Sequence, residues 1–141
     1  MPTVTRWFVK LSFIYLVLAL LIGVGLVAQG LGWIGGRMAL LSPVYFHFFM
    51  VGWVTQFIFG VAHWMLPNYS AQAPRGRESL IWGTLVTVNA GLILRALAEP
   101  FMGQGGIWGW MLVLSALLQW TGVMLFIINT WPRVRPRRLG G

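Results

Sequence analysis

The chain has 141 residues, of which 58% are hydrophobic and only 9% are charged, whereas soluble domains carry about 25% charged residues. Cysteine is absent and only two residues are acidic, which excludes disulfides and thiolate metal sites and leaves no basis for carboxylate metal cages or paired-carboxylate hydrolysis. The net charge of +8 does not indicate a nucleic-acid partner, because the basic residues flank long apolar segments, as they do in membrane proteins.

Four apolar segments are each long enough to cross a hydrocarbon core of about 30 Å, which takes about 20 helical residues. We therefore expect an all-α integral membrane protein, a bundle of four transmembrane helices in one domain over residues 1–141. The predicted helices cover residues 7–29, 43–66, 79–97 and 107–130. The first is too long for the apolar region of a signal peptide, so we expect it to be retained.

Local signals mark several helix ends. Ser42 with Pro43 is expected to open the second helix, and Ser79 is expected to cap the third. The serine hydroxyl oxygen can accept hydrogen bonds from the free backbone N–H groups of a first helical turn, and proline fits into that turn. Most tryptophans fall near predicted helix ends, as an aromatic belt requires. Trp53 and Trp120 fall near the middle of their helices instead, so we expect both to pack inside the bundle.

The basic residues predict the orientation. Eight of them lie on one side of a four-span protein: Arg6, Lys10, Arg75, Arg77, Arg133, Arg135, Arg137 and Arg138. The positive-inside rule then places both termini in the cytoplasm of a prokaryotic cell, with the protein crossing the inner membrane several times. Residues 132–141 are expected to form a basic cytoplasmic tail that lies on anionic lipid headgroups.

Polar side chains inside a membrane are costly, so each is a candidate for function. They are His47, Gln56, His63, Asn89, Arg95, Gln119 and Asn129. His47 lies about one turn into the second helix from the outer surface. An uncharged imidazole on a rigid helix is a good ligand for heme iron. The alternative is a histidine that is hydrogen-bonded to a neighbouring helix.

Arg95 is predicted at nearly the same depth as His47. A buried arginine needs an anion, and a heme propionate would supply one in a geometry that suits a guanidinium. The alternative is that Arg95 extends to the outer interface and pairs with Glu99, four residues later. Arg37, in the first loop, is a weaker second contact for the propionates. Met50, one turn beyond His47, either lines a heme pocket or fills the core.

His63 follows His47 by sixteen residues, which is about 24 Å along an α-helix and about 160° around it. The two histidines are therefore not expected to bind the same cofactor. We expect His63 to lie near the cytoplasmic headgroups. The alternatives are a second heme ligand, or a contact for a proton or a quinone.

The second helix reads His47-Phe48-Phe49-Met50-Val51-Gly52-Trp53, then Phe59-Gly60-Val61-Ala62-His63-Trp64-Met65-Leu66-Pro67. This stretch resembles the second membrane helix of the heme–copper oxidase subunit I superfamily, most of all its nitric oxide reductase branch and the short oxidase-like proteins near it. The resemblance implies that His47 is an axial ligand of a low-spin heme b. It gives His63 no ligand role, because His63 and Trp64 stand where the family has an aromatic pair.

The family's other heme and copper ligands lie in later helices, and this chain has only two histidines. No complete oxidase or reductase site is therefore expected, and whether the protein is an enzyme stays open. A six-coordinate heme would need its second ligand from a methionine, from a second copy of the chain in a homo-oligomer, or from a partner membrane subunit. An open sixth position would favour binding of a diatomic gas.

Three functions remain in order of preference. The first is a heme b membrane protein for electron transfer or gas binding, with a quinone or a cytochrome as redox partner. The second is a cofactor-free assembly or accessory subunit of a respiratory membrane complex. The third is a small transporter, which ranks last because no acidic residue lies within a predicted span.

Overall fold

The computed structural model describes residues 1–134, and within this range every regular element is a helix. Four stretches are long and apolar enough to cross a membrane, namely Thr3–Gly30, Met38–Met65, Glu78–Gln104 and Ile107–Arg133. The all-helical class and the four long apolar helices expected from the sequence are confirmed. Arg135, Arg137 and Arg138 of the expected basic tail lie outside the described residues.

The first stretch is α1 (Thr3–Gly30). The second runs without interruption through η1 (Met38–Leu41), α2 (Ser42–His47), η2 (Phe48–Thr55) and α3 (Gln56–Met65), and we call it the second long helix. The third is α4 (Glu78–Ala98), which continues into the short η3 (Glu99–Gln104). The fourth is α5 (Ile107–Thr130), which ends in η4 (Trp131–Arg133).

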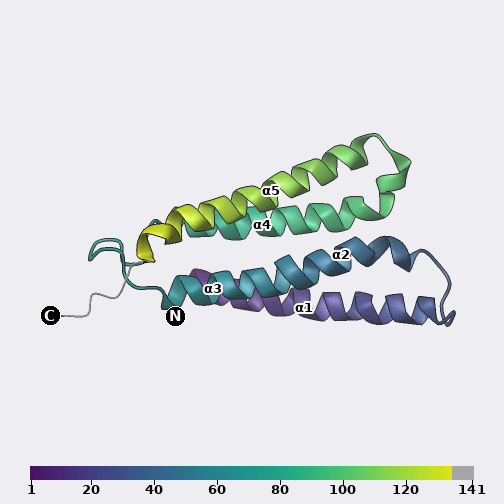
Figure 1. The fold of residues 1–141 in the computed structure, drawn as a ribbon, viewed down its shortest axis with the longest axis horizontal. Coiled ribbons are helices and arrows are strands. Elements are labelled where there is room, and N and C mark those ends of the chain that lie inside the picture. The colour runs from purple at the N-terminus through teal and green to yellow at the C-terminus, as the bar shows by residue number, and fades with distance from the viewer. Residues whose placement is uncertain (135–141) are drawn as a thin grey trace.

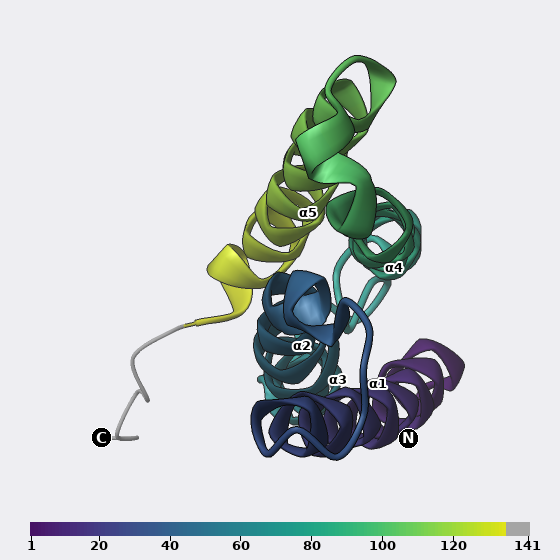
Figure 2. The ribbon, with the colours of Figure 1, turned by 90° about the vertical axis from the view of Figure 1, so that its right-hand side faces the viewer.

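The helices form two antiparallel hairpins that pack against each other (Figure 1). One hairpin is α1 with the second long helix, and the other is α4 with α5. The start of α1, the end of α5 and the segment that joins α3 to α4 lie together at what we call the terminal end (Figure 1). The other two connections lie at the opposite end. Figure 2 shows α5 on the far side of the molecule from α1.

Most apolar side chains lie on the surface of the single chain. In the first and fourth long helices, only 17% of the most apolar window is buried. An internal core therefore does not account for the hydrophobic composition, and exposed apolar faces of this extent are typical of proteins that contact lipid or another protein.

Two glycines allow α1 to approach the second long helix closely. A Cβ atom at Gly52 would lie 2.6 Å from the Tyr15 ring, and one at Gly60 would lie 2.8 Å from Cβ of Phe8. Phe8 also meets Phe59 edge to face, with ring centroids 6.4 Å apart. Small residues at such contacts let helices pack by van der Waals interactions, which drive helix association in lipid.

The α4–α5 hairpin uses the same device. A Cβ atom at Gly91 would lie 2.7 Å from Cγ of Gln119, and one at Gly122 would lie 2.5 Å from Cγ2 of Val88. The Ser115 hydroxyl donates a hydrogen bond of 2.7 Å to the Gly91 carbonyl oxygen. The close approach of the backbones thus also gives a polar side chain an acceptor on the neighbouring helix.

A pair of amides joins the two hairpins near mid-helix. Asn89 Nδ2 on α4 donates to Gln56 Oε1 at 2.9 Å, and Gln56 Nε2 contacts Asn89 Oδ1 at 3.4 Å. Each amide also donates to a backbone carbonyl of its own helix, that of Leu85 for Asn89 and that of Gly52 for Gln56. These hydrogen bonds account for two polar side chains inside the bundle as a structural link between the hairpins, and no ligand is needed to satisfy them.

The second long helix is π-helical over Phe48–Thr55, directly after His47. In a π-helix the backbone hydrogen bonds span five residues, and such segments are rare and often lie at functional sites. The Thr55 hydroxyl donates to the Met50 carbonyl five residues earlier, at 2.8 Å. The 100° step of an α-helix does not apply across this segment, so the expected angle of about 160° between His47 and His63 is not a valid estimate.

Several local expectations are wrong. The residues at the N-cap positions of α2 and α4 are Leu41 and Arg77, and no side chain caps either helix. Each helix begins one residue earlier than its serine signal indicated, at Ser42 and at Glu78, so each serine lies inside the first helical turn instead of before it. Trp120 is 62% exposed rather than internal, because it lies on a face of α5 that the other described residues do not cover. Trp53 is half-buried, with its ring 4.9 Å from that of Phe49.

Candidate functional site

His47 is held by its own helix. Its Nδ1 atom lies 2.9 Å from the Pro43 carbonyl oxygen, four residues earlier. A carbonyl oxygen has two lone pairs, so the Pro43 carbonyl can accept this hydrogen bond in addition to one from the helix backbone. A ring nitrogen facing a carbonyl carries the proton, so the Nε2 atom keeps its lone pair. Histidines that bind metals are oriented in the same way, by a backbone acceptor on the other ring nitrogen.

His47 points away from α1. Tyr45 packs against Gly23 of α1 and stacks on Phe49, with ring centroids 6.2 Å apart. His47 lies two residues from Tyr45, about 200° around an α-helix. It is half-buried, and its neighbours Phe46 and Met50 are 59% and 53% exposed. Phe46 and Met50 therefore provide apolar surface beside the imidazole, and most of this surface is not covered by the described residues.

Arg95 is paired with Glu99, which the sequence analysis gave as the alternative to a heme propionate. Its Nε atom lies 3.1 Å from Glu99 Oε2, in side chains that are 20% and 8% exposed. The two atoms are in ion-pair contact but are not aligned as a hydrogen bond, and neither has a hydrogen-bond partner within the described residues. Arg95 thus has a counter-charge in its own chain, while the hydrogen-bonding capacity of the pair is not used up.

Arg37 is exposed and lines a cavity of about 460 Å³ at the opposite end of the molecule. Other walls of this cavity come from Pro100, Phe101 and Gln104 of η3. Neither His47 nor Arg95 lines it. The structure therefore places Arg37 at the expected end but does not bring it into one cavity with His47.

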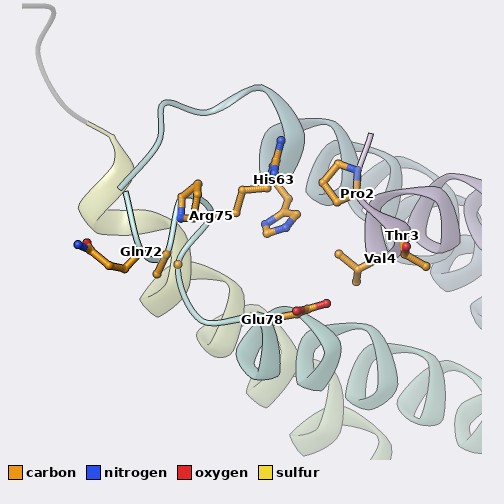
Figure 3. Close-up of a pocket in the computed structure, with 10 residues that line it drawn as sticks. Pro2, Thr3, Val4, His63, Gln72, Arg75 and Glu78 are labelled. Atoms are coloured by element: carbon orange, nitrogen blue, oxygen red, sulfur yellow. The ribbon is translucent and has the colours of Figure 1, made fainter. Parts of the chain in front are cut away.

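His63 lies at the terminal end and is only 3% exposed. Its Nδ1 atom is 3.4 Å from Nη1 of Arg133. A guanidinium has only donors, so Nδ1 accepts and the imidazole proton lies on Nε2. The imidazole points into a second cavity of about 460 Å³, between the start of α1 and the loop that carries Arg75 (Figure 3).

Arg133 is a site residue that the sequence analysis missed. It was assigned to a tail on lipid headgroups, yet it is 1% exposed. Nη2 donates to the carbonyl oxygens of His63 at 2.9 Å and Leu66 at 2.7 Å, and Nε donates to that of Pro67 at 3.0 Å. These are carbonyls at the C-terminal end of α3, which lack partners in their own helix.

The last two polar candidates have structural partners. Gln119 Nε2 donates to the Ser115 hydroxyl at 3.2 Å. Asn129 on α5 fixes the loop before α4, because its Oδ1 accepts from the Arg77 backbone N–H at 2.8 Å and its Nδ2 donates to the Arg75 carbonyl at 3.4 Å. This leaves His47 and His63 as the candidates with a ring nitrogen available to a ligand.

No group of three or more histidine, cysteine or acidic side chains that could hold a metal ion occurs in residues 1–134. A heme, which brings four ligands of its own, needs only one or two axial side chains. Comparison of the chain with protein-family models, with curated proteins and with solved structures finds no match. The candidate sites therefore depend on the residues and geometry of this chain.

Proposed function

We propose that this protein is a multi-pass membrane protein that binds heme b through His47. The single observation that carries the proposal is the orientation of His47, a half-buried imidazole whose Nδ1 atom is engaged by the Pro43 carbonyl and whose Nε2 atom has no partner within residues 1–134. The resemblance of the second long helix to heme–copper oxidase subunit I supports the same ligand. The adjacent π-helical segment is a further support, since such segments often accompany functional sites.

A heme bound to His47 would lie partly outside the single chain, because the apolar side chains beside the imidazole are exposed. Met50 and Phe46 offer apolar surface on the exposed side, and heme sites need apolar walls on both faces of the ring. A second copy of the chain, or a partner membrane subunit, would supply the other wall and a second axial ligand. In a two-fold symmetric dimer the two His47 side chains would lie at the same depth.

Arg95 and Arg37 would contact propionates in this proposal. Arg95 would do so while keeping Glu99, because the guanidinium has five donors and the ion pair is made through Nε, 3.1 Å from Glu99 Oε2. When bound, the heme would supply one-electron redox chemistry or a position for a diatomic gas. The chain's own residues orient the iron ligand and neutralise charge, and they provide no oxidase or reductase centre.

The proposed setting is a prokaryotic cytoplasmic membrane with both termini inside. The basic side chains at the terminal end, such as Arg75 and Arg77, support this orientation through the positive-inside rule. His47 then lies near the outer face, where a cytochrome or a quinone would exchange electrons with the heme.

An absorption spectrum of the purified protein, oxidised and then reduced with dithionite, tests the proposal. Sharp reduced α and β bands are expected for a six-coordinate low-spin heme and would indicate a ligand shared between subunits. A broad reduced spectrum that shifts with carbon monoxide would mean an open sixth position and gas binding. Absence of a Soret band after expression with added heme would overturn the proposal.

The alternative is a cofactor-free accessory subunit of a respiratory membrane complex. The specific observation in its favour is that the polar side chains of the helices largely satisfy one another. Arg95 has Glu99, and Gln56 has Asn89. A protein of this kind would co-purify with its complex and would lose that association, not a chromophore, when the exposed face around Trp120 is changed.

A further inference from the structure

The cavity at the terminal end is rich in hydrogen-bond donors. It is lined by the start of α1, by His63, by residues 72–76 and by Glu78, and its volume is about 460 Å³ (Figure 3). We propose that it binds the phosphodiester headgroup of an anionic phospholipid. The proposal rests on membrane insertion, but it does not rest on the heme.

The start of α1 supplies one set of donors. Pro2 precedes the helix, no side chain caps it, and its first turn has no acidic residue. The first intrahelical bond at this end runs from the Arg6 N–H to the Pro2 carbonyl. The N–H groups of Thr3 and Val4, which line the cavity, therefore have no acceptor in their own helix. A free helix start of this kind favours an anion.

His63 supplies an independent indication. It is 97% buried by exposed area, yet only its Nδ1 atom has a partner, Arg133. Its protonated Nε2 atom belongs to a side chain that points into the cavity (Figure 3). A phosphate oxygen in the cavity would accept a hydrogen bond from this N–H.

The local charge favours a monoanion. Arg75 lines the cavity and Arg133 lies directly behind His63, whereas Glu78 is the single carboxylate in the lining. Glu78 is already engaged by Trp82, whose Nε1 donates to Oε1 at 3.3 Å. The remaining positive charge suits a phosphodiester, and basic pockets between helices on the cytoplasmic side bind anionic headgroups in other membrane proteins.

Native mass spectrometry of the detergent-purified protein, titrated with phosphatidylglycerol or phosphatidylcholine, tests the proposal. We expect phosphatidylglycerol to bind about ten-fold more tightly. Arg75→Gln should lower this preference at least five-fold. Arg77→Gln is the matched control. It removes the same charge only two residues from Arg75, but Arg77 does not line this cavity, so the preference should stay unchanged. Equal binding of the two lipids, or equal effects of the two variants, would overturn the proposal.

Two further variants separate the anion from other ligands. Glu78→Gln should tighten phosphatidylglycerol, because it removes the repelling carboxylate but keeps an acceptor for Trp82. His63→Leu should weaken binding while His63→Gln, which keeps an N–H donor, should retain most of it. Weaker binding in Glu78→Gln, with displacement of the lipid by a soluble quinol analogue, would instead assign the cavity to a hydroxyl-bearing ligand.

Inorganic phosphate is the last comparison. Binding of phosphate as tight as that of phosphatidylglycerol would overturn a lipid as the source of the headgroup. These measurements do not depend on the heme spectrum, because the cavity lies at the opposite end of the second long helix from His47. A protein without heme that still prefers phosphatidylglycerol would refute the proposed function alone.

Discussion

Arg133 is the side chain with the most concentrated polar contacts in the described part of the chain. Its guanidinium reaches three backbone carbonyls and one imidazole nitrogen of a segment almost 70 residues earlier. Charged donors make stronger hydrogen bonds than neutral ones. Arg133 therefore ties the end of α5 to the end of α3 and fixes the tautomer of His63.

Arg133→Ala should destabilise the protein by about 2–4 kcal/mol, because it leaves several buried carbonyl groups without a donor. Arg133→Lys should restore only part of the loss, since one ammonium does not reproduce the planar fork. Thermal or denaturant unfolding in detergent measures both. Arg6→Ala, at an exposed position of α1, is the control and should change stability little. Equal stability of Arg133→Ala and Arg6→Ala would contradict the assignment.

His47→Ala should abolish heme binding, while His63→Ala should keep at least half of the heme of the unchanged protein. The reason is that only His47 combines a free Nε2 atom with exposed apolar surface beside it. Pyridine hemochrome content per chain measures this. Heme content that is the same in His47→Ala and in the unchanged protein would remove His47 as a ligand.

Some of the site residues could be predicted from the sequence, and others could not. His47 is visible from its position near a predicted helix end, and the possible pairing of Arg95 with Glu99 follows from their i,i+4 spacing. Arg133 is not visible in this way. It sits among four arginines within six residues, and what distinguishes it is a partner brought close only by the packing of α5 near α3.

At the scale of helices, glycines set the distances between neighbours. Gly52 receives the base of the Tyr15 ring, including its Cβ and Cγ atoms. The Cβ atom of Tyr15, 2.7 Å from the position of an added Cβ at Gly52, is fixed by the backbone of α1 and cannot move away without moving the helix.

Gly52→Ala should therefore destabilise the protein by about 1–3 kcal/mol through overpacking. Gly109→Ala is the matched control, because Gly109 lies in α5 with nothing within 4 Å of an added Cβ. It should have no effect or stabilise by up to about 1 kcal/mol, as alanine favours a helix. Unfolding in detergent compares the two, and a smaller loss for Gly52→Ala than for Gly109→Ala would show that α1 is not packed as described.

The existence of the helices was predictable, and their internal geometry was not. Length and hydropathy locate all four, and α5 has the bounds 107–130 that its flanking residues indicated. The π-helical segment leaves no mark in the sequence, because Phe48–Thr55 is apolar around its circumference and shows no periodicity to disturb. Serine cap signals failed because a long apolar helix extends past the first residue that can cap it.

For the whole molecule, the proposed orientation depends on the placement of charge, whereas the exposed surface follows from the open arrangement of the hairpins. α5 contacts α4 along its length and meets α3 through the stacked rings of Phe126 and Phe59, 3.9 Å apart. Toward the opposite end α5 diverges from α2 (Figure 1). Sequence periodicity could not show this, because faces that meet lipid and faces that meet helices are equally apolar.

Single cysteines test the orientation without background, because the chain has none. Gly103→Cys, at the opposite end, should react with a membrane-impermeant maleimide in intact cells. Ala71→Cys, in the loop between α3 and α4, should react only after permeabilisation, since the positive-inside rule places that loop in the cytoplasm. Labelling of Ala71→Cys alone in intact cells would reverse the proposed topology.

The π-helical segment also bears on how the chain could change over time. Loss of one residue between positions 48 and 55 would let the segment return to α-helical hydrogen bonds without breaking either end. A π-helix takes more residues per turn than an α-helix, so the segment with one residue fewer would turn the chain through about the same angle in α-helical form. His47 would then keep approximately its direction relative to Gly60, which docks on α1. Related chains that lack a single residue here would be expected to present the histidine to the same neighbour from an uninterrupted α-helix.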